Sequence, residues 1–472
     1  MPPDTRPGAL CGILSTATGA VEDDCATSGT GALASAAAVL AARLGAAGVR
    51  PDEPVVVTVA NRVADLAALF GVWQAGGVVV PLHAAAAETT RAAMLEQVRP
   101  RFLLADGELI TLADAPPPER PLLRGAALVV FTSGSTGKPK GVVIGHDRLA
   151  AKLDALQELL RLSPLDTVVL PLQLIFIFGL WVALLSLRAG ARLVLVGKFS
   201  PAALRQRLQG ATVLATVPSM LRTMFGEGEM EAPALRAILP GGEALGAHLS
   251  GQISHQLPGA GVFDLSGLTE TGSCDFCLAP RDAASGRGSI GLPTRGVTYR
   301  ISADDAAPVT TPAGAPRGEL QVRSPFGMLG YLDNPDLTEA AFVDGYFRTG
   351  DVARQRPDGF VEIVGRIKEI ISRGGNKIAP AEIELMLSAH PDVAQVLCAG
   401  VPDLRLGEAL HVAVVLKPGR TASADALRDW CKARTERFKV PDVIHMVDVL
   451  PTGPTGKALR AGIRALAQAR KL

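Results

Sequence analysis

Short apolar runs that alternate with helical patterns dominate the first 290 residues. The run Val55–Val59 is apolar apart from Thr58, as is typical of a strand that is buried on both faces. Comparable runs lie at residues 191–196, 211–217 and 235–240, and helical segments separate them. Because strands that alternate with helices favour a parallel sheet covered on both faces, this part of the chain is predicted to be α/β.

The pattern changes after about residue 290. Segments such as GELQVRSP, GYFRTGD and GFVEIVGR are short and alternating, which predicts antiparallel ribbons or a small barrel. Farther on, two helix-like segments (AEIELMLSAH and ADALRDWCKART) flank two strand-like ones (VAQVLCAGV and LHVAVVLK). The sequence therefore predicts a large N-terminal domain over residues 1–366, with parallel α/β sheets and a small β-barrel-like part, and a small α+β C-terminal domain over residues 367–472.

The composition is that of a globular protein, with 48% hydrophobic residues, 20% charged residues and a formal net charge of +1. A chain so close to neutrality has no field that would draw it onto nucleic acid or anionic lipid. Its start lacks the charged and apolar regions of a signal peptide. The most apolar stretch, Leu174–Leu187, is shorter than the about 20 residues that span a bilayer. We therefore expect a cytoplasmic protein without nucleic-acid or membrane partners.

The six cysteines do not form the framework of a disulfide-rich protein. Cys274 and Cys277 make a CxxC pair, but neither a second pair nor a nearby histidine is present to complete a four-ligand zinc site. Packing, or a place in a pocket wall, is favoured over a metal or redox role.

The segment Phe131–Gly141 reads FTSGSTGKPKG and follows the strand-like run AALVVF. Its glycines let backbone N–H groups approach an anion closely, and its hydroxyls and lysines add donors and positive charge. These features indicate a polyphosphate site, and a polar surface turn is the alternative. A Walker A loop is excluded, because Gly134 and Gly137 are too close together and a proline follows Lys138.

This loop resembles the phosphate loop of the adenylate-forming superfamily, which contains acyl- and aryl-CoA ligases, peptide-synthetase adenylation domains and luciferases. Further segments match motifs of that superfamily in the same order along the chain, and the chain is most like an acyl- or aryl-CoA ligase. They are LPGGEALG, SGLTETG, GELQVRSPFGMLGYLDNP, YFRTGDVARQRPDGFVEIVGRIKEIISRGGNKIAPAEIE and PTGPTGKALR.

The resemblance implies a site for ATP and Mg²⁺. Thr269 would contact the α-phosphate and Glu270 would hold Mg²⁺, although a helix-capping carboxylate is the alternative for Glu270. Asp351 would accept hydrogen bonds from the ribose hydroxyls, with a turn residue as its alternative, and Arg366 would support ribose and phosphate. The other ATP-binding residues that the motifs imply are Thr132, Ser133, Gly134, Ser135, Thr136, Gly137, Lys138, Lys140, Gly241, Gly242, Glu243, Ser266 and Gly267.

Lys457 lies in a glycine-bracketed loop and, by resemblance, reaches into the site for adenylation. Attack of a carboxylate on the α-phosphate brings two anions together, and a fixed ammonium with Mg²⁺ offsets the developing charge. A solvated tail lysine is the alternative. Lys368 corresponds to the hinge about which the mobile C-terminal domain of the superfamily rotates between two half-reactions. Gly374 and Gly375 would then leave room for the pantetheine chain of CoA.

The acid pocket is expected among residues 176–182, 241–243 and 264–274. No arginine or lysine occurs there to pair with a second carboxylate, and Asp264 is the one candidate partner for an α-amine. We therefore expect a small or medium apolar acid, either aryl or short acyl. The residues expected to make the pocket mostly apolar are Phe176, Phe178, Leu265 and Cys274.

Three positions depart from the superfamily pattern. Ser266 stands where relatives usually have a tyrosine that stacks on adenine, and Leu265 replaces a residue that is often glycine. Phe176 replaces a histidine that is common in aryl and acyl ligases. These differences concern adenine and acid binding.

The predicted reaction has two steps. The acid and ATP give acyl-AMP and pyrophosphate, and CoA then gives the acyl-CoA thioester and AMP. Two alternatives keep the first step and pass the acyl group either to the phosphopantetheine arm of an acyl carrier protein or to an amine. A non-catalytic relative that senses ATP is the remaining alternative, and retention of Lys457, Glu270, Asp351 and Arg366 disfavours it.

Overall fold

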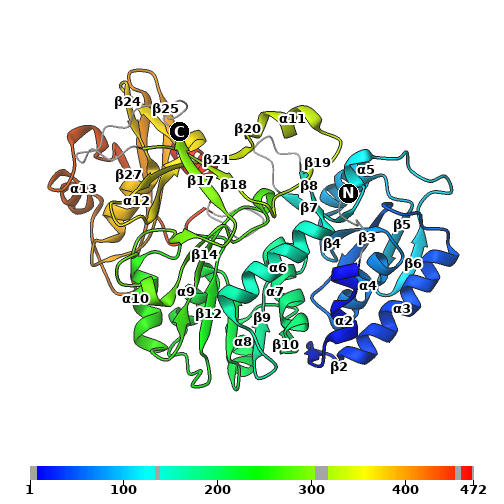
Figure 1. Cartoon of the computed structure of the whole chain (residues 1–472). Coiled ribbons are helices and arrows are strands. Elements are labelled where there is room, and N and C mark those ends of the chain that lie inside the picture. Colours follow the sequence, from blue (N-terminus) through cyan, green and yellow to red (C-terminus); the bar gives the residue numbers. More distant parts are fainter. Residues whose placement is uncertain (1–7, 133–138, 303–316, 452–458, 470–472) are drawn as a thin grey trace. The chain divides into compact units, whose positions relative to one another are not determined.

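The computed structural model describes residues 8–132, 139–302, 317–451 and 459–469 (Figure 1). The chain forms two compact units. The first contains Met1–Tyr299 and Val322–Phe347, and the second contains Arg300–Gln321 and Arg348–Leu472. The division between the units passes through strands β17 (Thr298–Ser302), β18 (Arg317–Arg323) and β21 (Tyr346–Gln355).

One sheet of the first unit has seven strands in the order β19-β8-β7-β4-β3-β5-β6. The central pairs β5–β3, β3–β4 and β4–β7 are parallel, whereas β6, β8 and β19 pair antiparallel to their neighbours. The apolar run Val55–Val59 lies in β3 and is buried apart from Thr58, as predicted. The strands are β3 (Pro54–Val59), β4 (Val78–His83), β5 (Phe102–Ala105), β6 (Glu108–Thr111), β7 (Ala126–Thr132), β8 (Lys140–Gly145) and β19 (Gly330–Tyr331).

The other sheet of this unit also has seven strands, in the order β13-β12-β11-β9-β10-β1-β2. All of its pairs are parallel except β1–β2. The three apolar runs predicted as strands are β10, β11 and β12, so the predicted α/β class is confirmed. The strands are β1 (Ala20–Glu22), β2 (Thr27–Gly29), β9 (Thr167–Leu170), β10 (Arg192–Leu195), β11 (Val213–Thr216), β12 (Ala237–Pro240) and β13 (Gly261–Val262).

Two helices lie between these sheets. Helix α6 packs on β7 and β8 of the first sheet, α7 packs on β9 and β10 of the second, and the two helices contact each other. Helix α7 contains most of the apolar stretch that is too short to span a bilayer, and it is buried on nearly every side. The helices of this unit are α1 (Gly8–Cys11), α2 (Ile13–Thr16), α3 (Thr30–Ala46), α4 (Val63–Gln74), α5 (Glu88–Val98), α6 (His146–Leu160), α7 (Ile177–Arg188), α8 (Pro201–Leu208), α9 (Pro218–Gly226), α10 (Ala247–Gln256) and α11 (Pro335–Ala340).

Short strands follow the two large sheets along the chain. One set has the order β14-β15-β16 and another has the order β17-β18-β21-β20, with β22 beside β21. The pairs β14–β15, β15–β16, β20–β21 and β21–β22 are antiparallel. The predicted barrel-like part corresponds loosely to these ribbons. Their remaining members are β14 (Asp264–Ser266), β15 (Phe276–Leu278), β16 (Leu292–Pro293), β20 (Phe342–Val343) and β22 (Val361–Arg366).

The second unit contains a sheet of order β24-β23-β26-β25, with β27 parallel to β26. Helices α12 and α14 pack on β25, and α13 packs on β27. The predicted order of helix, two strands and helix corresponds to α12, β25, β26 and α13. The elements are β23 (Ile371–Arg373), β24 (Asn376–Ile378), α12 (Pro380–Ser388), β25 (Val393–Asp403), β26 (Gly407–Leu416), α13 (Ala424–Lys432), β27 (Val443–Met446) and α14 (Arg460–Ala469). Within the described parts of the chain, no helix is long and apolar enough to cross a membrane.

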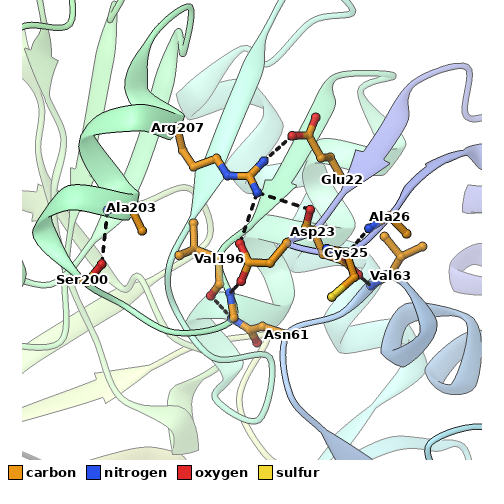
Figure 2. Close-up of polar contacts among 12 residues, drawn as sticks. Glu22, Asp23, Cys25, Ala26, Asn61, Val63, Val196, Ser200, Ala203 and Arg207 are labelled. Atoms are coloured by element: carbon orange, nitrogen blue, oxygen red, sulfur yellow. Dashed lines mark hydrogen bonds and ion pairs between the residues drawn. The ribbon is translucent and has the colours of Figure 1, made fainter.

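Asn61 joins the two large sheets. It follows β3 of one sheet and is fully buried, with a left-handed φ of 61°. Its side-chain amide donates to the carbonyl oxygens of Leu172 and Val196 (2.8 and 3.3 Å), which follow β9 and β10 of the other sheet. Its side-chain oxygen accepts a hydrogen bond from the backbone N–H of Leu174 at 2.8 Å. Figure 2 shows Asn61 beside Val196.

The carboxylate of Asp23 makes a second link near Asn61 (Figure 2). It accepts hydrogen bonds from the backbone N–H groups of Cys25 and Ala26 at 2.7 Å, which close the turn between β1 and β2. It also accepts one at 2.7 Å from Val63 at the start of α4. Arg207 of α8 contacts the carbonyl oxygen of Asp23 at 3.4 Å. Buried polar groups therefore hold loops of both sheets together.

Two replacements of Asn61 distinguish the stability contributed by its side-chain hydrogen bonds from the effect of its left-handed backbone conformation. Asn61→Gly removes the side-chain bonds but tolerates positive φ, so we expect a loss of about 2 kcal/mol in the free energy of unfolding. Asn61→Ala adds left-handed strain and should lose about 3 kcal/mol. Urea unfolding of both variants measures the losses. If either variant were as stable as the unmodified protein, the proposed role of Asn61 in joining the two sheets would be contradicted.

Candidate nucleotide and acid site

The phosphate-loop motif connects strands β7 and β8. Residues 133–138, which include six of the predicted ATP-binding residues, lie outside the described residues. The two flanking members, Thr132 and Lys140, stand directly opposite each other at the ends of the antiparallel pair. Thr132 therefore lies at the end of β7, which runs parallel to β4 in the centre of its sheet.

Glu270 and Lys140 are brought together by a tyrosine. Residues Thr269–Thr271 form a single 3₁₀ turn after β14. The hydroxyl of Tyr331 donates to Glu270 Oε1 at 3.1 Å, and Lys140 Nζ lies 5.3 Å from the centre of the Tyr331 ring. Burial, followed by the neighbouring Glu270 carboxylate, raises the pKa of Tyr331, so its proton stays on the hydroxyl. The structure thus joins the hairpin of the phosphate loop to the turn that carries Thr269 and Glu270.

Tyr331 received no role from the sequence, although it lies in one of the matched segments, GELQVRSPFGMLGYLDNP. It is 4% exposed, and its strand β19 pairs with β8 of the phosphate hairpin. A buried tyrosine usually finds a partner for its hydroxyl. The chain contains only three tyrosines, so the position of Tyr331 inside a matched motif was the sequence signal that could have identified it as a site residue.

The predicted adenine-side turn follows β12. Gly241 forms an isolated parallel bridge with Leu265, which places the turn beside β14. Gly242 has a left-handed φ of 79°. The carboxylate of Glu243 accepts hydrogen bonds from Ser219 Oγ (2.9 Å) and Arg222 (3.2 Å) of α9. Ser266 is the last residue of β14 and Gly267 follows it, so the residues predicted on the adenine side lie on adjacent segments.

The predicted acid-pocket residues lie in different surroundings. Phe178 stacks on Trp181 with ring centres 5.3 Å apart, and a Cβ placed on Gly241 would lie 2.9 Å from the Phe178 ring. Phe178 and Gly241 therefore contact each other closely. Leu265 and Cys274 are buried in the main core, with exposures of 5% and 2%. Phe176, the remaining residue predicted to line the acid pocket, is 47% exposed and precedes α7.

Cys274 and Cys277 both pack in the main core of the first unit. Burial raises the pKa of Cys274 to about 11 and that of Cys277 still further. In the part of the chain that the structure describes, no group of three or more His, Cys, Asp and Glu side chains could hold a metal ion. Asp264, which stands opposite Leu278 in the β14–β15 pair, has its pKa raised to about 7 by burial.

Asp351 and Arg366 are direct neighbours in the second unit. They oppose each other on β21 and β22, and Arg366 Nε lies 2.8 Å from Asp351 Oδ1. Burial raises the pKa of Asp351, and the Arg366 guanidinium opposes that effect. Thr349 fixes the backbone next to Asp351, because its Oγ1 accepts a hydrogen bond from the Asp351 N–H at 3.0 Å and donates one to the Leu320 carbonyl oxygen at 2.6 Å.

Lys368 lies in the 3₁₀ turn Ile367–Glu369, immediately after β22. Gly374 and Gly375 form the tight turn between β23 and β24, with left-handed φ values of 55° and 83°. The N–H of Gly374 donates to the Leu406 carbonyl at 2.7 Å, which fixes one side of that turn. Lys457 lies outside the described residues.

Comparisons with known proteins agree with the order of these motifs. The family model "AMP-binding enzyme" matches residues 20–121 and 108–332, and "AMP-binding enzyme C-terminal domain" matches residues 382–457. Feruloyl-CoA synthase of an Amycolatopsis species is 32% identical over 452 residues, which cover 90% of this chain and 91% of that protein. 2-Succinylbenzoate–CoA ligase of Geobacillus kaustophilus is 30% identical over 471 residues, covering 95% of this chain and 94% of that protein.

Solved structures give the same result. o-Succinylbenzoate CoA synthetase of Bacillus subtilis, in complex with ATP and a magnesium ion, is 26% identical with a TM-score of 0.82, covering 97% of this chain and 99% of that chain. The amide bond synthetase McbA of Marinactinospora thermotolerans is 26% identical with a TM-score of 0.84, covering 98% of this chain and 99% of that chain. The predicted resemblance is confirmed, and the chain belongs to the AMP-binding enzyme family of adenylate-forming proteins.

Proposed function

We propose that the protein is an AMP-forming acid–CoA ligase. The observation that carries this proposal is the contact of Glu270 with Tyr331 and of Tyr331 with Lys140, which joins two matched nucleotide motifs. Named CoA ligases match this chain over 90% or more of its length. The use of ATP and CoA also fits the predicted cytoplasmic location.

The first step forms a mixed anhydride. A carboxylate oxygen of the acid attacks the α-phosphorus of ATP, the bond from that phosphorus to the bridging oxygen breaks, and pyrophosphate leaves. We assign Thr269 to the α-phosphate and Thr132 and Lys140, with the intervening loop, to the β- and γ-phosphates. Lys457 is assigned to the charge that develops as the two anions meet, because a fixed ammonium offsets it.

Glu270 fits a role as a Mg²⁺ ligand. Its Oε1 accepts from Tyr331, while no hydrogen bond or ion pair to Oε2 is found among the described residues. Mg²⁺ in nucleotide sites takes one or two carboxylates together with substrate phosphates and water. A bound Mg²⁺ would supply positive charge against the phosphates. Tyr331 would orient the carboxylate for that purpose.

In the second step, the CoA thiol loses its proton, its sulfur attacks the acyl carbonyl carbon, and AMP leaves. We propose the domain boundary between residues 366 and 367, with Lys368 as the hinge of the mobile domain. Asp351 and Arg366 would bind the ribose, and their separation of 2.8 Å lets the guanidinium orient the carboxylate. The Gly374–Gly375 turn exposes thin backbone, which suits a pantetheine chain.

We propose a small or medium apolar acid, aryl or short acyl. Phe178 supplies an aromatic face beside Gly241, and Leu265 is bridged to the same glycine. An acyl carrier protein is the second candidate acceptor, since a fatty acid–acyl-carrier-protein ligase of Streptomyces coeruleorubidus is also 32% identical over 469 residues. Product masses after incubation with CoA, a carrier protein or an amine distinguish these acceptors.

Replacement of Lys457 tests the adenylation step separately from the thioester-forming step. Lys457→Ala should lower pyrophosphate release from ATP and an accepted acid by about 10²–10³-fold, because one charge-stabilising donor is lost. Thioester formation from synthetic acyl-AMP and CoA should persist, since it expels AMP without adenylation. Lys471→Ala, another lysine change near the C-terminus, is the matched control and should leave both steps unaltered. Undiminished pyrophosphate release by Lys457→Ala would contradict the assignment.

Asp264 should make stability depend on pH. Burial raises the pKa of Asp264 to about 7. Folding therefore retains a proton that the unfolded chain releases near pH 4, so this group's contribution falls as pH rises from about 4 to about 7. Asp264→Asn should exceed the unmodified protein in stability by on the order of 2 kcal/mol at pH 8 and by little at pH 4.5.

Denaturant unfolding between pH 4.5 and 8 measures this difference. The exposed residue Asp114 provides the matched control, and Asp114→Asn should give no such trend. A difference for Asp264→Asn that stays constant across the range would show that the carboxyl group titrates normally.

A further inference from the structure

The turn after Glu270 has an unusual backbone. Gly272, Ser273 and Cys274 are consecutive residues with positive φ, at 88°, 65° and 50°. The left-handed region costs a non-glycine residue roughly 1–2 kcal/mol, so Ser273 and Cys274 keep this conformation only if neighbours enforce it. We refer to residues 268–275 as the acidic turn, because it carries Glu270 and ends at Asp275.

Lys152 of α6 is one such neighbour. It is 1% exposed, and its Nζ donates to the Cys274 carbonyl oxygen at 2.8 Å. The same Nζ lies 4.9 Å from the centre of the Phe326 ring, a cation–π distance. A buried ammonium costs several kcal/mol unless it is paired, so a hydrophobic side chain would be the cheaper way to fill this place. The presence of a lysine at this buried position therefore indicates a role other than packing.

Both groups that Lys152 contacts belong to segments that hold Glu270. Cys274 lies in the acidic turn itself. Phe326 lies just before Met328, whose N–H donates to the Glu270 carbonyl at 2.8 Å, and five residues before Tyr331, which donates to the Glu270 carboxylate. One ammonium thus ties together the two segments between which Glu270 is held.

The far end of the acidic turn is fixed by a second buried charge. Asp275 is 1% exposed, and its Oδ2 accepts a short hydrogen bond from the Thr271 hydroxyl and one at 3.4 Å from the Leu268 N–H. Its Oδ1 is buried without a hydrogen-bond partner among the described residues. Burial raises the pKa of Asp275 to about 6, and the charge of Lys152 opposes that effect.

We propose that Lys152 is a positioning residue for adenylation, which holds the acidic turn in its left-handed conformation and so sets the place of Thr269 and Glu270. The inference rests on the proposed roles of those two residues. Lys152 does not touch the reacting atoms in this account. It acts through the Cys274 carbonyl and the Phe326 ring.

Lys152→Met tests this role because methionine preserves most of the volume and removes the charge. A group that only fills the core would give a folded variant with normal activity, although the unpaired Cys274 carbonyl lowers its stability. A positioning role predicts an adenylation kcat lowered by about 10–100-fold under conditions in which the variant is fully folded, and an unchanged KM for the acid. Leu156→Met, a conservative change at another buried position of α6, controls for general disturbance of that helix.

Glycine at position 273 provides a rescue. Glycine adopts positive φ without cost, so Ser273→Gly should return part of the activity lost in Lys152→Met. The double-mutant cycle should therefore show coupling between the two positions. The indole N–H of Trp181 reports on the turn independently of activity, because it lies 3.5 Å from Ser273 Oγ. Its ¹⁵N–¹H resonance should shift in Lys152→Met, where Ser273 is retained, and should stay unchanged in Leu156→Met.

The outcomes separate this inference from the proposed function. An adenylation rate of Lys152→Met within about twofold of the unmodified protein, or a loss of rate that parallels a loss of stability without rescue by Ser273→Gly, would overturn the inference. Glu270→Gln serves as the reference. If Glu270→Gln kept full adenylation activity, the proposed role of the turn would fail, whatever the Lys152 variants do.

Discussion

Close backbone packing around residues 266–275 is the constraint on which the candidate site depends. A Cβ on Gly267 would lie 2.5 Å from Cys274 N, and one on Gly272 would lie 2.5 Å from the Phe326 carbonyl oxygen. Side chains are therefore excluded at both places, and the chain can fold back on itself immediately after β14. The conformation is strained at Ser273 and Cys274, and buried polar groups offset that strain. Thr269 and Glu270 owe their positions to this arrangement.

The larger fold explains why the turn lies where it does. Helices α6 and α7 fill the space between two sheets, and each packs on one of them. Lys152 reaches the turn from α6, while Trp181 reaches it from α7. The phosphate hairpin comes from one sheet, and the Gly241 turn follows a strand of the other. The first unit thus brings these candidate nucleotide-binding segments from both sheets, and Asn61, which lies earlier in the chain, joins those sheets.

The sequence predicted the regular parts of the fold and the enzyme family well. Continuous apolar runs identified strands β3, β10, β11 and β12, because strands buried on both faces leave a simple pattern. The motifs identified the family, and the roles assigned to their residues stay predictions. Tyr331 and Lys152 received no role, since a single side chain acquires its partner only through tertiary contacts. Lys152 did carry a signal, because it falls on the buried face of α6 with Leu149, Leu153 and Leu156. The sequence likewise did not indicate that Phe176 is exposed, because a phenylalanine that precedes an apolar helix is usually assigned to the hydrophobic core.

The central claim is that the acid passes through acyl-AMP on its way to the thioester, and an oxygen label tests it most directly. An accepted acid carrying ¹⁸O in both carboxyl oxygens is incubated with ATP, Mg²⁺ and CoA, and the products are analysed by mass spectrometry. The account predicts one ¹⁸O in AMP, one ¹⁸O in the acyl-CoA and none in pyrophosphate, because the attacking oxygen stays on the α-phosphorus. Labelled inorganic phosphate together with ADP, or AMP without label, would contradict it.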